Sequence, residues 1–199
     1  MVDGMSESLV WYVSYGSNMS RGRLGCYIGG GCPPGAAVTY LGARDSTPPR
    51  AEAGVALPGR LYFAGDSHVW GGGVAFYDHD VPGPTPAKAY LVTTEQFSDI
   101  AAQEMHRLPD PDDPLEEVLM GIPEGGRHRA GPGHYETLID VGRRDGLPML
   151  TFTSPHGAGA VEHTEPSEAY LAMIANGLQE AHGWHEAEVT EHLRSLVAA

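Results

Sequence analysis

The sequence predicts a globular chain that combines short β-strands with α-helices. The chain has 199 residues, the size of one ordinary domain, and folding at that size removes roughly 70% of the unfolded chain's surface from water. Short runs of β-branched and aromatic residues stop at glycine or proline, as strands do. Other segments carry helix-capping residues and an apolar stripe. We expect a single domain over residues 1–199, with many turns because the chain holds 27 glycines and 16 prolines.

The first predicted strand covers residues 9–15. Its sequence, Leu-Val-Trp-Tyr-Val-Ser-Tyr, is rich in β-branched and aromatic residues and stops at Gly16, as expected of a buried strand that leads into a turn. Further along the chain we expect, in order, a short helix at 20–28, a loop at 42–59, and strands at 60–64, 73–77 and 88–92.

The clearest helix prediction covers residues 94–105. Thr93 and Gln96 can form a capping box, and neither Gly nor Pro interrupts the interior of the segment. Residues 108–133 contain five prolines and five glycines, so we expect a loop-rich insertion there, with at most one helical turn near 115–119. The last predicted elements are a hairpin of 135–141 with 149–153 around a turn at 142–146, and two helices at 168–181 and 186–197 separated by Gly183.

The charge balance and composition exclude several classes of function. Lys and Arg number 12 against 26 acidic residues, which gives a net charge of −14; such a surface repels phosphate backbones, so we expect no nucleic-acid partner. No apolar run approaches the roughly 18 residues of a membrane span, and no basic stretch precedes an apolar one near the start, so we expect no membrane partner and a cytoplasmic protein. Cys26 and Cys32 are too few for a disulfide framework or a metal site. We therefore expect no metal. The run at 29–31 lacks the Gly-x-Gly-x-x-Gly spacing of a dinucleotide site, and we expect no cofactor.

Glu104 is the unusual residue of the predicted helix at 94–105. On a helical wheel of 100° per residue, its carboxylate falls within the apolar arc that Phe97, Ile100 and Met105 form. Burial disfavours the charged form of a carboxyl group, and a carboxyl that can accept and return a proton suits general acid–base catalysis. Two structural alternatives stay open: the helix ends before Glu104, or its carboxylate pairs with an arginine.

The second candidate feature is the turn Tyr15-Gly16-Ser17-Asn18 at the end of the first strand. Gly16 permits a turn that a side chain would block, and the turn exposes successive backbone N–H groups that favour an anion such as a carboxylate. The same sequence is also typical of an ordinary turn in which Ser or Asn caps the next segment. Ser17 is not predicted to be a nucleophile, because the Gly-x-Ser-x-Gly motif is absent.

Together these features resemble the γ-glutamylcyclotransferase superfamily, including its plant avirulence-induced relatives and its biosynthetic γ-glutamyl-removing members. The resemblance covers most of residues 9–182. It rests on four loose motifs in the same order as in the family: Tyr15-Gly16-Ser17-Asn18 after the first strand, the stretch 70–76, the strand 89–92 followed by a helix that ends in Gln103-Glu104, and a C-terminal helix with Pro166-Ser167, Tyr170, Ile174 and Gly177.

The resemblance implies an α+β fold, a small mixed β-barrel with helices packed around it, and an intramolecular reaction on a small-molecule γ-glutamyl compound. The α-amine of the γ-glutamyl group attacks its own side-chain amide carbonyl, which gives 5-oxoproline and releases the attached amine. By this resemblance Glu104 is the general acid and base. The backbone N–H groups of Gly16, Ser17 and Asn18 hold the α-carboxylate or stabilise the oxyanion, Tyr15 forms a wall, and the hydroxyl of Tyr170 either reaches the substrate or only packs in the core.

Two departures from the family pattern concern recognition of the leaving amine. Met105 follows Glu104 where the family commonly has glycine, and Pro109-Asp110-Pro111 stands where a second tyrosine is expected. The alternatives are a non-catalytic small-molecule-binding or regulatory module on the same fold, and a γ-glutamyl hydrolase that uses water. Because residues 108–133 begin just after Glu104, we also expect that segment to cover the pocket as a lid or specificity loop.

Overall fold

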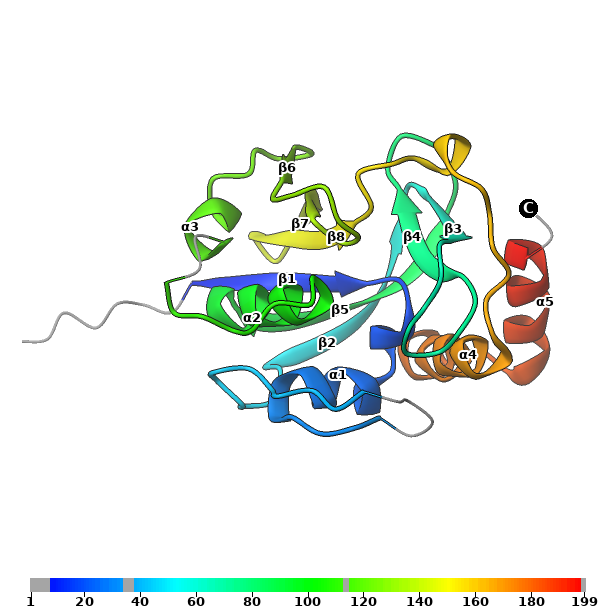
Figure 1. The fold of residues 1–199 in the computed structure, drawn as a ribbon, viewed down its shortest axis with the longest axis horizontal. Coiled ribbons are helices and arrows are strands. Elements are labelled where there is room, and N and C mark those ends of the chain that lie inside the picture. The colour runs from blue at the N-terminus through cyan, green and yellow to red at the C-terminus, as the bar shows by residue number, and fades with distance from the viewer. Residues whose placement is uncertain (1–7, 34–37, 113–114, 198–199) are drawn as a thin grey trace, which may run out of the picture.

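The computed structural model describes residues 8–33, 38–112 and 115–197 (Figure 1). Helices and strands alternate irregularly along the chain. The elements are β1 (Leu9–Ser14), the 3-10 turn η1 (Ser17–Met19), α1 (Arg21–Gly29), β2 (Ala51–Leu57), β3 (Arg60–Ala64), β4 (Val74–Asp78), β5 (Thr85–Thr93), α2 (Thr94–Glu104), α3 (Leu115–Leu119), β6 (Arg127–Arg129), β7 (Thr137–Arg144), β8 (Leu147–Thr153), the 3-10 turn η2 (Ala158–Ala160), α4 (Glu168–His182) and α5 (Glu186–Val197).

The strands form a six-stranded mixed sheet in the order β2-β5-β1-β8-β7-β6 and a separate hairpin of β3 and β4. In the large sheet β1 pairs antiparallel with β5 and parallel with β8. The α+β class is confirmed, and the six described strands form an open sheet with β2 and β6 at its edges, in place of a closed barrel. The Thr153 hydroxyl links the hairpin to this sheet, because it donates to Tyr77 O at 2.9 Å and accepts from Tyr77 N at 2.8 Å.

Strand β1 is buried on both faces, which explains its nearly continuous apolar sequence. Successive side chains of a strand point to opposite faces of the sheet. Val10 and Tyr12 accordingly belong to one core, which α1, α2 and α3 cover, whereas Trp11 and Val13 belong to a second core, which α4, α5 and the β3–β4 hairpin cover. The central position of β1 places its C-terminal end between the two cores.

Strand β2 corrects the predicted loop at 42–59. It pairs antiparallel with β5 along its whole length, from Ala51 opposite Leu91 to Leu57 opposite Thr85. Its residues are mostly small and lack the β-branched signal of strands. The reason is the helix packed against it: a Cβ added to Gly54 would lie 2.3 Å from the carbonyl oxygen of Ala181, at the end of α4.

Two smaller corrections concern the segment between α2 and α4. Within the predicted insertion at 108–133, the single helical turn is present as α3, but Arg127–Arg129 adds a short edge strand, β6. The β7–β8 hairpin is longer than predicted, because β7 passes through a bulge after Asp140 and the turn tightens to Asp145-Gly146. Both turn residues have positive φ, 52° and 78°, as the favoured two-residue hairpin turns require.

Helix α2 begins with the predicted capping box: Gln96 N donates to the Thr93 side chain, and Thr93 N donates to the Gln96 side chain. The helix is buried on nearly every side. Asp99, which lies outside the apolar arc in the sequence, is 1% exposed and pairs with Arg44 at 2.8 Å. The segment that follows α1 therefore covers the side of α2 that its sequence suggests is exposed.

Within the described ranges, no helix combines the length and the apolar character needed to cross a membrane.

Helix α4 packs closely against the turn η1 at Gly177. A Cβ added there would lie 2.4 Å from Met19 Cβ and 2.9 Å from the backbone nitrogen of Ser20. The Tyr90 hydroxyl also donates to Met19 O at 2.7 Å. The turn that follows β1 is thus held between α4 and β5, and a glycine is needed where α4 crosses it.

We predict that Gly177→Ala lowers the free energy of unfolding by about 1–3 kcal/mol, the usual cost of overpacking a well-packed core. The control is Gly25→Ala on the exposed side of α1, where an added Cβ meets no atom within 4 Å; it should be neutral or stabilising by up to about 1 kcal/mol. Denaturant titration of both variants measures the difference, and equal effects at the two positions would contradict the packing described for Gly177.

Candidate active site

The ends of β1 and α2 come together because of how the sheet is connected. Strand β5 runs antiparallel to β1, so that Thr93 stands opposite Leu9, and Thr94 N donates to Ser8 O at 2.9 Å. Helix α2 therefore starts beside the start of β1 and returns along it (Figure 1). Its last residue, Glu104, lies close to the turn that follows β1.

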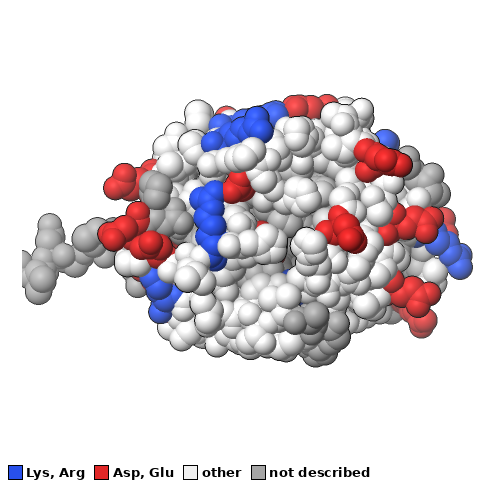
Figure 2. All heavy atoms as spheres, viewed as in Figure 1, with Lys and Arg blue, Asp and Glu red and all other residues white. Residues whose placement is uncertain are grey.

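A pocket of about 320 Å³ opens at this place, and Figure 2 shows a hollow near the centre of the same face. Its wall comes from the end of β1, the turn after it, α1, the end of α2 and the loop before β7. All six residues that the sequence nominates line it: Tyr15, Gly16, Ser17, Asn18, Glu104 and Tyr170.

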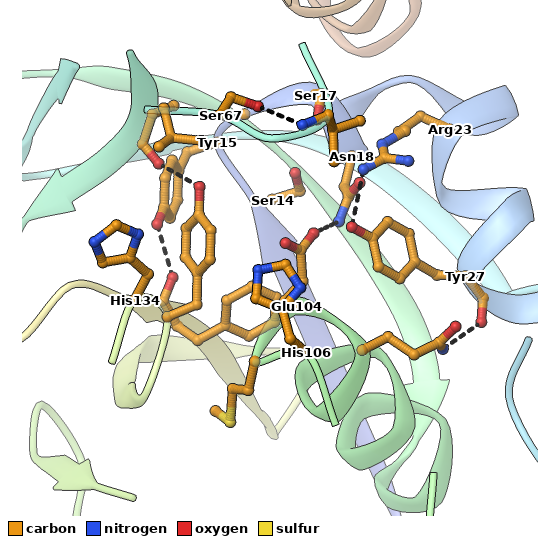
Figure 3. A pocket seen from close by; sticks show the side chains of 18 of the residues that line it. Ser14, Tyr15, Ser17, Asn18, Arg23, Tyr27, Ser67, Glu104, His106 and His134 are labelled. Atoms are coloured by element: carbon orange, nitrogen blue, oxygen red, sulfur yellow. Dashed lines mark hydrogen bonds between the residues drawn. The ribbon is translucent and has the colours of Figure 1, made fainter. Parts of the chain in front are cut away.

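The Glu104 carboxylate is half-buried and held by a side chain of the turn (Figure 3). Asn18 Nδ2 donates to Glu104 Oε1 at 2.8 Å and to the Tyr12 hydroxyl at 3.1 Å. Asn18 itself is 4% exposed, and its Oδ1 has no partner among the described atoms. The helix therefore continues through Glu104, whose carboxylate faces the pocket and makes no salt bridge among the described residues.

Gly16 is required by a close approach and not by its backbone angles. Its φ of −116° lies outside the left-handed region, so a side chain here would be blocked by its neighbours and not by the value of φ. A Cβ at this position would lie 3.2 Å from the Tyr170 hydroxyl and 3.5 Å from Ala75 Cβ. The missing side chain leaves room for Tyr170 beside the turn.

The two nominated tyrosines differ in what their hydroxyls do. The Tyr15 hydroxyl donates to the backbone oxygen of Phe152 at 2.7 Å. Its ring forms part of the pocket wall. The Tyr170 hydroxyl accepts from Ala75 N at 3.3 Å. Burial raises the pKa of Tyr170 to about 12 and that of Tyr15 well above its ordinary value. Both phenols are neutral at physiological pH.

The pocket also contains residues that the sequence does not nominate, among them Arg23, Tyr27 and Tyr135. Arg23 is 3% exposed although it is charged. A signal for it exists in the sequence, because it shares the apolar stripe of α1 with Leu24 and Tyr27 at helical spacing. Tyr135 has a φ of 60° and donates to Ala75 O at 2.9 Å; it supplies an aromatic side chain in a pocket whose expected tyrosine after Glu104 is missing.

Arg23 stays charged in this site. Burial acts to lower its pKa, but the attraction of the Glu104 carboxylate and the hydrogen bond to the Tyr40 hydroxyl act against burial, and the pKa of Arg23 lies above its ordinary value. Burial also raises the pKa of Tyr27 well above the ordinary value. The pocket therefore places the Arg23 cation in the same wall as the Glu104 carboxylate and several neutral hydroxyls.

Of the described residues in the segment 108–133, Gly133 alone lines the pocket. Leu115 and Leu119 of α3, together with Ile122, are buried in the core beside Ile100. The described part of this segment is anchored in the core. It does not cover the pocket as a lid in this structure.

Among the described residues there is no group of three or more His, Cys, Asp and Glu side chains that could hold a metal ion.

Comparison with known sequences gives one relative and no family. No protein-family model matches the chain. A curated protein of Arabidopsis thaliana named "Histone deacetylase 5" is 31% identical over 203 residues, which covers 95% of this chain and 31% of that protein. The chain thus spans less than a third of the length of this relative, whose name describes a much larger protein.

Comparison with solved structures identifies the fold. An uncharacterized human protein has a TM-score of 0.53 at 17% identity, over 96% of this chain and 89% of that one. A protein named "Gamma-glutamyl cyclotransferase" has a TM-score of 0.53 at 16% identity, over 95% of this chain and 88% of that one. The chain therefore has the γ-glutamylcyclotransferase-like fold, and the resemblance found in the sequence is confirmed at the level of the fold.

The Asn18 contact gives a direct test of the site's electrostatics. Asn18→Asp replaces an amide donor by a second carboxylate beside Glu104, so we predict a loss of about 1–3 kcal/mol in the free energy of unfolding at pH 7. The loss should shrink below about pH 4, where protonation of one carboxyl removes the repulsion.

The matched control is Asn176→Asp, at the other asparagine of the sequence, which is exposed on α4. It should change stability by less than about 0.5 kcal/mol. Denaturant titrations of both variants at pH 7 and pH 4 decide the matter. A loss in the Asn18→Asp variant that is the same at both pH values would show that the two carboxyls do not interact.

Proposed function

We propose that this chain is a γ-glutamylcyclotransferase-like enzyme that acts on small γ-glutamyl compounds. The observation that carries the proposal is the half-buried Glu104 carboxylate, held by Asn18 Nδ2 at 2.8 Å inside a pocket at the end of β1. This arrangement joins two of the four motifs on which the resemblance rests. The fold shared with a γ-glutamyl cyclotransferase supports the same assignment.

In the proposed reaction Glu104 moves one proton. Its carboxylate takes a proton from the α-ammonium of the bound γ-glutamyl group, and the freed amine attacks the γ-carbonyl carbon. The carbonyl oxygen becomes an oxyanion, which the backbone N–H groups of Gly16, Ser17 and Asn18 would stabilise. As the tetrahedral intermediate collapses, the bond to the leaving nitrogen breaks and Glu104 returns its proton to that nitrogen. The attacking nitrogen gives up its remaining extra proton to the released amine, which leaves as an ammonium ion. The products are 5-oxoproline and a free amine.

A reaction of this kind needs few catalytic groups. The nucleophile belongs to the substrate, so the main task of the protein is to hold the chain in its folded, ring-closing conformation. The rings of Tyr15, Tyr135 and Trp70 line the pocket, and apolar walls of this kind limit the access of water. No water is consumed and no cofactor is required by the chemistry, which separates the proposal from a γ-glutamyl hydrolase.

The proposed role of Glu104 is tested with a panel of γ-glutamyl amino acids and γ-glutamyl amines, with 5-oxoproline measured by mass spectrometry. We predict that Glu104→Gln folds normally, still binds ligand and loses at least about 100-fold in rate, the usual size of a general-base contribution. Glu95→Gln, at the partly exposed start of the same helix, is the matched control and should retain the parent rate.

Other outcomes would contradict the proposal. Equal rates in the Glu104→Gln variant and the parent protein would remove Glu104 from the mechanism. Free glutamate in place of 5-oxoproline would show a hydrolase, and binding of γ-glutamyl compounds with no product from any of them would show a non-catalytic binding module.

A further inference from the structure

Arg23 is a buried cation without an anionic partner. Its Nη2 donates to the hydroxyls of Tyr27 at 2.9 Å and Tyr40 at 2.7 Å, but its Nε and Nη1 have no hydrogen-bond partner. The salt bridges of the described residues join other cations, and none includes Arg23. Only 3% of the residue is exposed, and the side chain stands in the wall of the pocket.

The other deeply buried cation of the described chain is paired. Lys88 is 2% exposed, and its ammonium lies 3.1 Å from Glu52 and 2.9 Å from Glu180. Burying a charge without such partners costs several kcal/mol. A ligand of opposite charge would explain why the fold keeps an unpaired guanidinium at Arg23.

Aromatic rings fix the guanidinium beside the pocket. Its central carbon lies 4.8 Å from the centre of the Tyr27 ring, 4.5 Å from that of Tyr40 and 5.5 Å from that of Trp70. These contacts stabilise a cation through the faces of the rings, but they do not satisfy its N–H groups. Arg23 and all three rings line the pocket that contains Glu104.

The charge opposite to that of Arg23 lies within the same pocket. The Tyr27 hydroxyl accepts from Arg23 Nη2, and Arg23, Tyr27 and Glu104 line the same pocket. The pocket thus presents an anion and a cation near each other. An α-amino acid group, with ammonium and carboxylate on one carbon, has the complementary pair of charges.

We propose that Arg23 anchors the α-carboxylate of the γ-glutamyl group through its unpaired N–H groups, and so selects substrates that carry this carboxylate. The inference rests on the proposed function. It also divides the work of the site: with the carboxylate on Arg23 and the ammonium on Glu104, the N–H groups of the turn at Gly16–Asn18 are left for the oxyanion. Guanidinium–carboxylate hydrogen bonds are about twice as strong as neutral ones, which suits an anchor.

The test compares two ligands that differ only in the carboxylate: 5-oxoproline and 2-pyrrolidinone. Calorimetry should show that the parent protein binds 5-oxoproline roughly 10- to 100-fold more tightly, the effect expected of a hydrogen bond to a charged group. Arg23→Met should abolish this preference, and Arg23→Lys, which keeps the charge, should retain part of it. Arg21→Met, at the exposed neighbour on α1, is the matched control and should keep the preference in full.

Three results would overturn the proposal. One is a parent protein that binds both rings equally. Another is an Arg23→Met variant that loses affinity for both rings to the same extent, which would give Arg23 only a structural role. The third is unchanged binding of 5-oxoproline together with slower turnover of γ-glutamyl amino acids alone, which would place the carboxylate of the leaving group on Arg23.

Thermal unfolding of each variant without ligand checks that it folds. If Arg23→Met does not fold, the parent ligand pair and the Lys variant still decide. The binding readout also separates this proposal from the proposed function. If binding prefers the carboxylate because of Arg23, but no γ-glutamyl compound gives 5-oxoproline, the role of Arg23 is supported and the proposed enzyme activity is contradicted. If turnover depends on Glu104 but binding shows no preference for the carboxylate, only the role of Arg23 is contradicted.

Discussion

One hydrogen bond, from the Asn18 side chain to the Glu104 carboxylate, connects two segments that lie 86 residues apart in the sequence. It forms because β5 and α2 make the chain return along β1, so that the turn after the strand and the last residue of the helix meet. The site depends on this meeting. A shift of either element would leave the Glu104 carboxylate without its donor.

The rest of the fold holds both ends of that hydrogen bond in place. On the side of the turn, the Tyr90 hydroxyl binds Met19 O and α4 packs against the turn through Gly177. On the side of the helix, Arg44 binds the buried Asp99. Charges are paired in these supporting contacts, whereas the guanidinium of Arg23 is left unpaired beside the pocket. In the proposed function, stability and recognition would depend on different cations of the same molecule.

Local signals predicted much of this structure and tertiary contacts decided the rest. The β-branched run of β1, the Thr93 cap of α2 and the apolar neighbours of Glu104 are all visible within a few residues of sequence. Strand β2 is not, because its small residues are set by the approach of α4. The missing partner of Arg23 is also invisible in the sequence, since it depends on rings brought to α1 from other parts of the chain.

The most direct test of the account is a crystal structure of the protein with bound 5-oxoproline. The ring nitrogen of this compound is the former α-amine, so the account predicts that it lies within hydrogen-bond distance of the Glu104 carboxylate, with Asn18 still donating to the same group. A ring bound elsewhere on the protein, or a Glu104 side chain turned out to solvent in the complex, would contradict it.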